Sequence, residues 1–418
     1  MTAYVQALDT IVGQCTPLPA ERIPASDSLG RILASAVVSP EDLPPFANSA
    51  MDGFALYAAT QTLAAGTEFT VEGSCAAGDG QVRGGDGAWE IMTGARMPDG
   101  LDTIVPVEQV DVLQHDAQGQ AQRIRLKAEV RPDQHLRKRG EDVQRGEQVA
   151  APGQMLRAAH LALLAALGVA AVDVVRQPRV AVINTGRELV TDPAQALQPG
   201  QIRESNSALL VAQLAAAGAD VVWQQVVGDE PQEFKAAVQA ALAAGAEVLV
   251  STGAVSMGRY DFVPDTLRAL GARIHFHKVR IRPGKPLLFA TLPGGQLYFG
   301  LPGNPASSAV GLRFFVEPAL RRMLGLAPEQ PLRVPLTTPA GKPVPLRRFL
   351  KARLTCDGQG QLQAQVLSGQ ESFKIAPLLR SNAWVAIDED AGAVPLGALV
   401  EVHATGHLQG LQPELLLE

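Results

Sequence analysis

The sequence predicts a multidomain α/β protein: a central three-layer α/β domain with a mostly parallel sheet, an inserted β-rich module and a C-terminal β-barrel-like domain. Strand and helix patterns alternate over 178–325, whereas short alternating strands separated by turn residues fill 46–138 and 326–418. A chain of 418 residues is long enough for about three domains. We assign the remaining stretches, 1–45 and 139–177, to an N-terminal linking domain.

The composition excludes several classes of protein. With 46% apolar and 19% charged residues the chain has the composition of a folded globular protein, and a net charge of −6 offers no basic surface to nucleic acid. Three scattered cysteines indicate free thiols in a reducing compartment, and residues 1–10 lack the features of a signal peptide. The longest apolar stretch, Leu161 to Val172, reads as a core helix too short to cross a bilayer. We therefore expect a soluble cytoplasmic protein.

The N-terminal half predicts one helix and a set of short strands. The helix has an apolar face formed by Val5, Leu8, Ile11 and Val12. Proline-rich residues then lead to Asp52-Gly53, a tight turn that presents a carboxylate. Strands of the inserted module are expected at 69–71, 89–92, 103–107 and 124–126. The segment that follows the module, 135–142, sets Asp142 beside three basic residues.

The α/β domain carries its polar residues where its strands end. Glu188 follows the strand at 180–183, and Asp229 follows the strand at 221–227. A buried strand at 248–250 is followed by a loop that contains Gly253 and Asp261. A further strand leads into the stiff turn Leu301-Pro-Gly-Asn-Pro305 and a helix start rich in small residues, which favours anions. Because ligands bind outside the carboxyl ends of parallel strands, these segments should gather at one edge of the sheet.

A cationic segment follows the acidic loop. Read as a strand, 277–282 has Lys278, Arg280 and Arg282 on one face, and Lys285 adds a fourth cation in the next turn. Cations suit phosphate and a carboxylate suits a hydrated metal ion, so the pair of segments favours a phosphorylated ligand with its metal. The alternative is a solvated edge strand. For Arg347, Arg348 and Lys351 of the C-terminal domain we favour a solvated edge over ligand contact.

Motifs of several enzyme classes are absent from the sequence. It contains no phosphate-binding Gly-x-x-x-x-Gly-Lys-Ser/Thr loop, no Gly-x-Gly-x-x-Gly fingerprint and no His-Glu-x-x-His pair. Ser251, Ser256 and Ser307 have no visible His and Asp partners, which argues against a serine hydrolase. His275 and His277 alternate along a strand, a pattern more typical of a surface than of a metal site.

Nearly the whole chain resembles the molybdopterin molybdenumtransferase family, which includes MoeA and the E domain of gephyrin. The motifs that carry the resemblance are residues 44–53, 92–98, 139–142, 184–186, 228–229, 251–261, 282–286 and 301–305. The resemblance implies the final step of molybdenum cofactor biosynthesis, in which adenylyl-molybdopterin is hydrolysed with the help of Mg²⁺, molybdate enters the dithiolene and AMP is released. It also makes 178–325 the molybdopterin-binding domain.

Matched position by position, the family motifs imply a set of functional residues. The implied catalytic acids are Asp52, Asp142, Glu188, Asp229 and Asp261. Of these, Asp261 together with Asp229 or Glu188 is expected to hold Mg²⁺. The implied polar, cationic and turn contacts to the substrate are Thr93, Lys278, Arg282, Lys285, Pro302 and Pro305. To these we add Gly253, Ser256 and Asn304, which lie in the same loop and turn.

The family also implies an elongated homodimer, in which the inserted module of one subunit covers the sheet of the other. Other proteins of molybdenum cofactor biosynthesis are further candidate partners. Three departures from the family pattern bear on the site. Ala254 replaces the usual second glycine of the loop, Val263-Pro264 stands where a lysine is common shortly after the loop aspartate, and Ala376-Pro377 stands where a serine pair is common. Two alternatives stay open, a molybdopterin adenylyltransferase, which resembles 178–325 alone, and a non-catalytic scaffold such as gephyrin. The sequence does not distinguish molybdate from tungstate.

Overall fold

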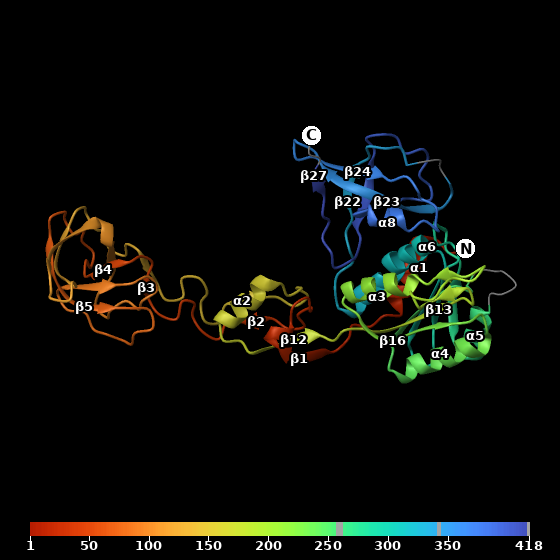
Figure 1. The fold of residues 1–418 in the computed structure, drawn as a ribbon, viewed down its shortest axis with the longest axis horizontal. Helices are drawn as coiled ribbons and strands as arrows, with labels where there is room; N and C mark the ends of the chain where they lie inside the picture. Colours follow the sequence, from red (N-terminus) through yellow and green to blue (C-terminus); the bar gives the residue numbers. More distant parts are fainter. Residues whose placement is uncertain (256–261, 341–343, 416–418) are drawn as a thin grey trace. The chain divides into compact units, whose positions relative to one another are not determined.

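The computed structural model describes residues 1–255, 262–340 and 344–415. The chain forms two compact units (Figure 1). The large unit comprises Met1–Glu21 and Val175–Glu418, and the small unit comprises Arg22–Val174. Strands β1 (Ala20–Pro24) and β12 (Ala171–Val175) contain the points where the chain passes from one unit to the other. The mixed α/β class predicted from the sequence is confirmed.

A six-stranded sheet forms the centre of the large unit. Its strands, in spatial order, are β16 (Asp220–Val227), β13 (Arg179–Thr185), β17 (Val248–Thr252), β21 (Leu297–Leu301), β20 (Leu288–Thr291) and β18 (Arg273–His277). The first four strands are parallel, and β20 runs antiparallel to both of its neighbours. The carboxyl end of β18 therefore lies at the same edge as the ends of the parallel strands.

Helices cover both faces of this sheet and complete three layers. Side chains alternate along β13, so that Val180 and Val182 pack in the core with α3 (Asn206–Ala216) and α6 (Pro305–Gly311). On the opposite face, Ala181 and Ile183 pack in the core with α4 (Pro231–Ala243) and α5 (Val263–Ala269). Figure 1 shows α4 and α5 on the side of the sheet away from α3 and α6. Two short strands, β14 (Leu189–Val190) and β15 (Ile202–Arg203), pair outside the main sheet.

The first helix of the chain, α1 (Tyr4–Gly13), packs on the α3 and α6 side of the sheet. Its buried positions are Ala7 and Ile11, whereas Val5 is 62% exposed. The apolar face predicted from the sequence was therefore wrong at Val5. The ring of Tyr4 packs edge-on against Phe315 and Phe349 and so orients the helix. The face that packs against the core therefore carries residues 4, 7 and 11.

The C-terminal domain is a curled sheet. Its path runs β19 (Ile281–Arg282), β23 (Arg347–Cys356), β25 (Ala383–Ile387), β26 (Leu399–Ala404) and β22 (Leu332–Pro335). Beside β23 lie β24 (Leu362–Val366) and β27 (Glu414–Leu415), and the N–H of Thr337 donates to the carbonyl of Ala364, so the sheet curls toward a barrel. A short helix, α8 (Ala376–Leu379), precedes β25. Because β19 belongs to the chain of the α/β domain, this sheet joins the two domains of the large unit.

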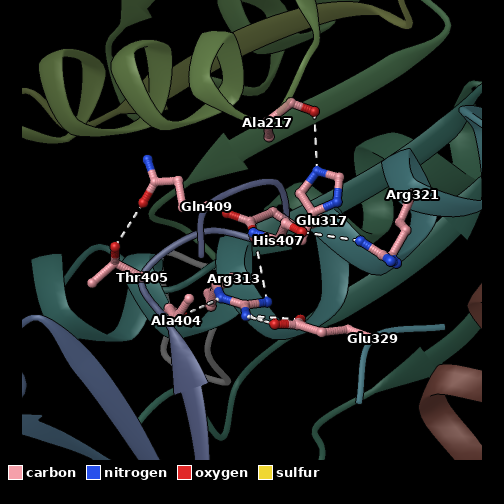
Figure 2. A network of polar contacts seen from close by, with 9 residues as sticks. All are labelled: Ala217, Arg313, Glu317, Arg321, Glu329, Ala404, Thr405, His407 and Gln409. Atoms are coloured by element: carbon pink, nitrogen blue, oxygen red, sulfur yellow. Dashed lines mark hydrogen bonds and ion pairs between the residues drawn. The ribbon is translucent and has the colours of Figure 1, made fainter. Parts of the chain in front are cut away.

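Buried polar residues also join these two domains (Figure 2). Helix α6 continues through a π-helical segment, η3 (Leu312–Val316), into α7 (Glu317–Met323). The fully buried Arg313 guanidinium donates to the carbonyl of Ala404 at 2.9 Å and to both carboxylate oxygens of Glu329 at 2.7 and 2.8 Å. The carboxylate of Glu317 accepts the backbone N–H of His407 at 2.8 Å. Burial raises the pKa of Glu317 to about 8, while the nearby Arg313 opposes that rise.

The small unit contains the β-rich module and a linking part. The module is a six-stranded sheet with the order β7 (Thr103–Pro106), β4 (Gly53–Leu56), β6 (Ala88–Ile91), β5 (Glu68–Cys75), β9 (Ala121–Leu126) and β8 (Val110–His115). The linking part holds the elements β2 (Val37–Val38), β3 (Asn48–Ser49), β10 (Leu136–Arg137), β11 (Gln148–Ala150) and α2 (Ala158–Ala166). The remaining elements are single 3₁₀ turns, η1 (Ala25–Asp27) and η2 (Val107–Gln109).

The apolar stretch Leu161 to Val172 is not one core helix, as the sequence had suggested. Helix α2 ends at Ala166, and the chain then enters β12 at Ala171. Gly168 takes the left-handed conformation with φ of +66°, which terminates the helix. Only Leu164 of this helix is fully buried. Among the described residues, no helix has both the length and the apolar character needed to cross a membrane.

Candidate functional site at the carboxyl edge of the sheet

The register of the parallel strands brings four predicted segments to one edge of the large unit. Thr185 of β13 lies opposite Val227 of β16, and Thr252 of β17 lies between Asn184 and Leu301. Glu188, Asp229, Gly253 and the turn at 302–305 all follow these residues directly in the chain. The sequence predicted this gathering because parallel strands end at the same edge. Which of the residues bind or catalyse stays a prediction.

Two carboxylates lie beside the turn that follows β13. The backbone N–H of Arg187 lies 3.4 Å from the Asp229 carboxylate, which comes from the neighbouring strand end. Glu188 folds back over Gly186: a Cβ at Gly186 would lie 2.8 Å from its Oε1 atom and 2.9 Å from Oε2. Both acids are half-buried. A side chain at position 186 would push the Glu188 carboxylate aside, so the glycine leaves room for this acid to fold back over the turn.

Gly253 lies where the backbones of two strand ends approach closely. Its φ is +88°, and a Cβ there would lie 2.5 Å from the Thr185 hydroxyl and 2.7 Å from the Thr185 carbonyl oxygen. The N–H of Gly253 donates to the carbonyl of Leu301, which ties the loop to the end of β21. The next residue, Ala254, is also left-handed, with φ of +50°. Two successive residues of this kind make a sharp turn that only the first can adopt without strain.

A buried polar cluster beneath Gly253 fixes the ends of β13 and β17. The Thr252 hydroxyl donates to Asn184 Oδ1 at 2.8 Å. Asn184 Nδ2 donates to Glu204 at 3.0 Å and to the hydroxyl of Ser207 at 2.6 Å. Asn206, which begins α3, donates to the carbonyl of Gly303 at 2.8 Å. Asn184 and Thr252 belong to motifs noted in the sequence, whereas Glu204, Asn206 and Ser207 do not, because a side chain's partners across a sheet are not visible in its local pattern.

The turn at 302–305 is formed as predicted, but the anion site expected at the start of its helix is not free. Pro305 is the first residue of α6, and Pro302 is buried with its carbonyl accepting the hydroxyl of Ser308 at 2.5 Å. The backbone N–H of Ala306 donates to the carbonyl of Ser372 at 3.0 Å, and Asn304 Nδ2 donates to the Ser372 hydroxyl at 3.2 Å. The start of α6 is therefore already hydrogen-bonded to the C-terminal domain.

The cationic segment is not the continuous strand that the sequence suggested. Strand β18 ends at His277, and Lys278 is left-handed with φ of +83°. Arg280 forms an ion pair with Glu389 of the C-terminal domain at 2.9 Å. Arg282 and Lys285 are exposed. Since the turn at Lys278 breaks the period of two, Lys278, Arg280 and Arg282 do not share one strand face.

Arg282 lines a pocket of about 730 Å³ together with Arg348 and Glu371 of the C-terminal domain. Arg348 is 4% exposed and Lys351 is 1% exposed, so the solvated edge favoured from the sequence was wrong. Strand β23 carries both residues and is flanked by β19 and β24 on one side and β25 on the other. Burial lowers the pKa of Arg348, and the charge of Arg282 lowers it further. Two guanidinium groups thus face the same cavity.

A second pocket of similar volume, about 740 Å³, lies among α1, α7 and β26. Its lining includes Tyr4, Phe314 and His403 and lacks the acids of the sheet edge. Size therefore does not decide where the chemistry takes place. We assign the candidate site to the sheet edge because the carboxylates, the glycine turn and the Pro302–Pro305 turn lie together there.

In the small unit, Asp52 and Thr93 are brought together. The Asp52 carboxylate accepts the backbone N–H of Thr93 at 2.7 Å and its hydroxyl at 2.8 Å. These two hydrogen bonds lower the pKa of Asp52, which is fully exposed and therefore ionised at neutral pH. Asp142 is also exposed and lies in a separate turn, where its N–H donates to the carbonyl of Leu43. Asp261 and Ser256 lie outside the described residues.

Family models match three consecutive parts of the chain. Residues 2–168 match the MoeA N-terminal region (domain I and II). Residues 181–322 match a probable molybdopterin-binding domain, and residues 333–405 match the MoeA C-terminal region (domain IV). The two units and the C-terminal domain of this chain are thus each matched.

Curated proteins and solved structures resemble the chain over nearly its full length. A molybdopterin molybdenumtransferase of Synechococcus elongatus is 37% identical over 96% of this chain and 99% of its own length. A second, from Haemophilus influenzae, is 32% identical and covers 94% of this chain and 96% of its own length. The crystal structure of the molybdopterin biosynthesis MoeA protein from Pyrococcus horikoshii OT3 is 27% identical, with a TM-score of 0.77 and coverage of 96% of this chain and 99% of that one.

Proposed function

Since the chain belongs to the molybdopterin molybdenumtransferase family, and is thus an enzyme of molybdenum cofactor biosynthesis, we propose that it catalyses Mg²⁺-dependent hydrolysis of adenylyl-molybdopterin. The reaction inserts molybdate into the dithiolene and releases AMP. The main support is the gathering of two carboxylates, a glycine turn and the Pro302–Pro305 turn at one sheet edge. A ligand at this edge would meet all four. The match of both flanking regions disfavours an adenylyltransferase built from 178–325 alone.

The donor set at the sheet edge fits Mg²⁺. Mg²⁺ usually takes one or two protein carboxylates and fills its other positions with water and substrate phosphate. Glu188 and Asp229 supply two carboxylates over one turn, and Asp261 is the third proposed ligand. When bound, the ion would neutralise charge on the phosphates that are cleaved.

The remaining residues are proposed to bind and orient the substrate. Lys278, Arg282 and Lys285 attract its phosphates and the entering oxyanion, and Arg348 lies in the cavity that Arg282 lines. Gly253 and the turn at 302–305 allow a ligand to approach the backbone, and Ser256 belongs to the same proposed contact set. Asp52, oriented by Thr93, acts as a fixed negative charge rather than as a proton donor, since its lowered pKa keeps it ionised. Asp142 is the second proposed catalytic acid of the small unit.

AMP release is expected to depend on Asp229. Replacing Asp229 with Asn keeps the shape of the side chain but removes one of the three negative charges proposed to bind Mg²⁺. At limiting Mg²⁺, release of AMP from adenylyl-molybdopterin should fall by at least about tenfold, because loss of metal-site groups weakens affinity or activity by this order. The assay measures AMP and active cofactor with molybdate and, separately, with tungstate.

Two controls sharpen this test. Asp265→Asn changes another exposed acid, at the start of α5, and should leave the Mg²⁺ dependence unchanged. A wild-type protein that releases no AMP under any condition but binds molybdopterin would support the scaffold instead. Wild-type Mg²⁺ dependence in Asp229→Asn would remove this residue from the metal site.

Substrate binding is expected to lose part of its salt dependence when Lys278 is replaced. An attraction between Lys278 and phosphate is screened by salt, so Lys278→Ala should weaken binding at low ionic strength and flatten its decline with added salt. Arg273→Ala, at the opposite end of β18, removes an exposed cation far from the edge and serves as the matched control. Identical salt slopes for wild type and Lys278→Ala would leave the cationic segment without this role.

The site is further proposed to be shared between two subunits of a homodimer. Asp52, Thr93 and Asp142 belong to the small unit, while Glu188, Asp229 and Gly253 belong to the large unit. The family resemblance assigns functional acids to both groups. A two-fold dimer would let the small unit of one chain serve the sheet edge of the other. Other proteins of cofactor biosynthesis remain proposed partners.

A further inference from the structure

A histidine that the proposed chemistry does not use binds the loop at the sheet edge. The Nε2 atom of His277 lies 2.6 Å from the carbonyl oxygen of Val255. A carbonyl only accepts, so Nε2 carries the proton of this hydrogen bond. His277 is the last residue of β18, and Val255 lies three residues beyond β17, which is three places away in the sheet. The bond therefore holds the loop across the ends of β21 and β20.

The segment that this bond holds is strained. Gly253 and Ala254 are both left-handed, a conformation that glycine adopts freely but that the Cβ of an alanine makes unfavourable. Strain of this kind persists only where the surroundings enforce it. After Ala254, the Val255 side chain is buried at 2% exposure, and a Cβ on Gly300 would lie 2.8 Å from its Cγ1 atom. One hydrogen bond and one packing contact thus fix the residue that follows the strained alanine.

Holding Val255 also fixes where Gly253 meets the neighbouring turn. The N–H of Gly253 donates to the Leu301 carbonyl, and a Cβ on Gly303 would lie 3.8 Å from the Gly253 Cα. The loop at Gly253 and the Pro302–Pro305 turn are both proposed to contact the substrate. They therefore stay aligned with each other only while the loop keeps its sharp turn. A glycine at position 254 would adopt this turn without support, whereas Ala254 needs it.

We propose that His277 is a positioning residue, which offsets the strain at Ala254 and keeps Gly253 aligned with the Pro302–Pro305 turn for the binding of adenylyl-molybdopterin. The inference rests on the proposed function for the identity of the substrate. It does not require His277 to touch the substrate or to exchange a proton.

The test compares steady-state kinetics of three variants. His277→Leu keeps the bulk and removes the donor, and the KM for adenylyl-molybdopterin should rise about tenfold with kcat changed less than about threefold, as expected for the loss of one hydrogen bond. His277→Gln restores a donor and should recover most of the wild-type KM. His275→Leu is the matched control, since His275 lies two residues earlier, contacts the Thr291 hydroxyl at 3.0 Å and stacks on Phe289. Its KM should stay at the wild-type value.

A double-mutant cycle distinguishes positioning from general support of the fold. If His277 acts by holding a strained Ala254, then Ala254→Gly should reduce the effect of His277→Leu from about tenfold to about threefold or less. Equal effects in both backgrounds, or no recovery with His277→Gln, would overturn the proposal. A wild-type protein without AMP release refutes the proposed function itself, whereas an active wild type with an unaltered His277→Leu refutes only the role of His277.

Discussion

Mixing two inactive variants, Asp52→Ala and Asp229→Ala, should restore about a quarter of the wild-type activity. Each variant alone lacks one proposed catalytic acid in every site and should show only background release of AMP. In a dimer whose sites combine the small unit of one chain with the large unit of the other, each mixed dimer has one site with both acids intact. Random exchange makes half of the dimers mixed, so a quarter of all sites recover.

A site built within one chain gives the opposite result. Every site of a mixed dimer would then lack either Asp52 or Asp229, and activity would stay at background. The control pairs Glu188→Ala with Asp229→Ala, two acids of the same unit. This pair should not complement under either arrangement. Failure of the first pair to recover, after subunit exchange has been demonstrated with two differently tagged chains, would refute the shared site.

The main strands of the α/β domain could be predicted from the sequence because their hydrophobic patterns are local. The strand predicted at 180–183 extends to Arg179–Thr185, and the strand predicted at 221–227 begins one residue earlier, at Asp220. A short, continuous apolar run flanked by small residues is typical of a buried strand in a parallel sheet. Where two apolar segments adjoin without a polar break, as at Leu161 to Val172, the end of the helix depended on one left-handed glycine.

The parts of the site that the sequence did not predict depend on contacts between distant segments. Arg348 and Lys351 read as a solvated edge because nothing nearby shows that β23 pairs with β19 and lies within the sheet. The left-handed turn at Lys278 likewise depends on partners elsewhere, since its carbonyl accepts the N–H of Thr2 and its N–H donates to Leu287. Side chains do not alternate regularly between two faces through such a turn. The prediction of a single cationic face, which assumed that alternation, therefore failed.

Acid should destabilise the contact between the C-terminal domain and the α/β domain. Burial, together with the charges of Arg313 and Arg347, lowers the pKa of His403 to about 3. Burial likewise lowers the pKa of His407 to about 4, opposed by its hydrogen bond to the Ala217 carbonyl (Figure 2). Both rings are therefore neutral in the folded protein at any pH near 6.5, the usual value for histidine.

The sign of the effect follows from where the protons bind. Between pH 6.5 and the folded pKa, the unfolded chain takes up a proton on each histidine that the folded chain does not. The stabilisation is complete above pH 6.5 and is lost as the pH falls toward 4 for His407 and 3 for His403. From pH 7 to pH 5 each histidine removes about 2 kcal/mol. Glu317 acts in the opposite direction, because its raised pKa lets the folded chain hold a proton that the unfolded chain releases above about pH 4.5.

Comparing wild type with His403→Phe separates one histidine from these other groups. The phenyl ring can keep the edge-on contact that His403 makes with Phe314, and it does not titrate. Glu317 and His407 are common to both proteins, so the loss of stability between pH 7 and pH 5 should be about 2 kcal/mol smaller in the variant. Hydrogen exchange of peptides from β25 and β26, corrected for the intrinsic rate at each pH, measures the free energy of opening in this domain. Equal losses in the two proteins would mean that His403 is protonated in the fold or that its surroundings open without a change in its charge.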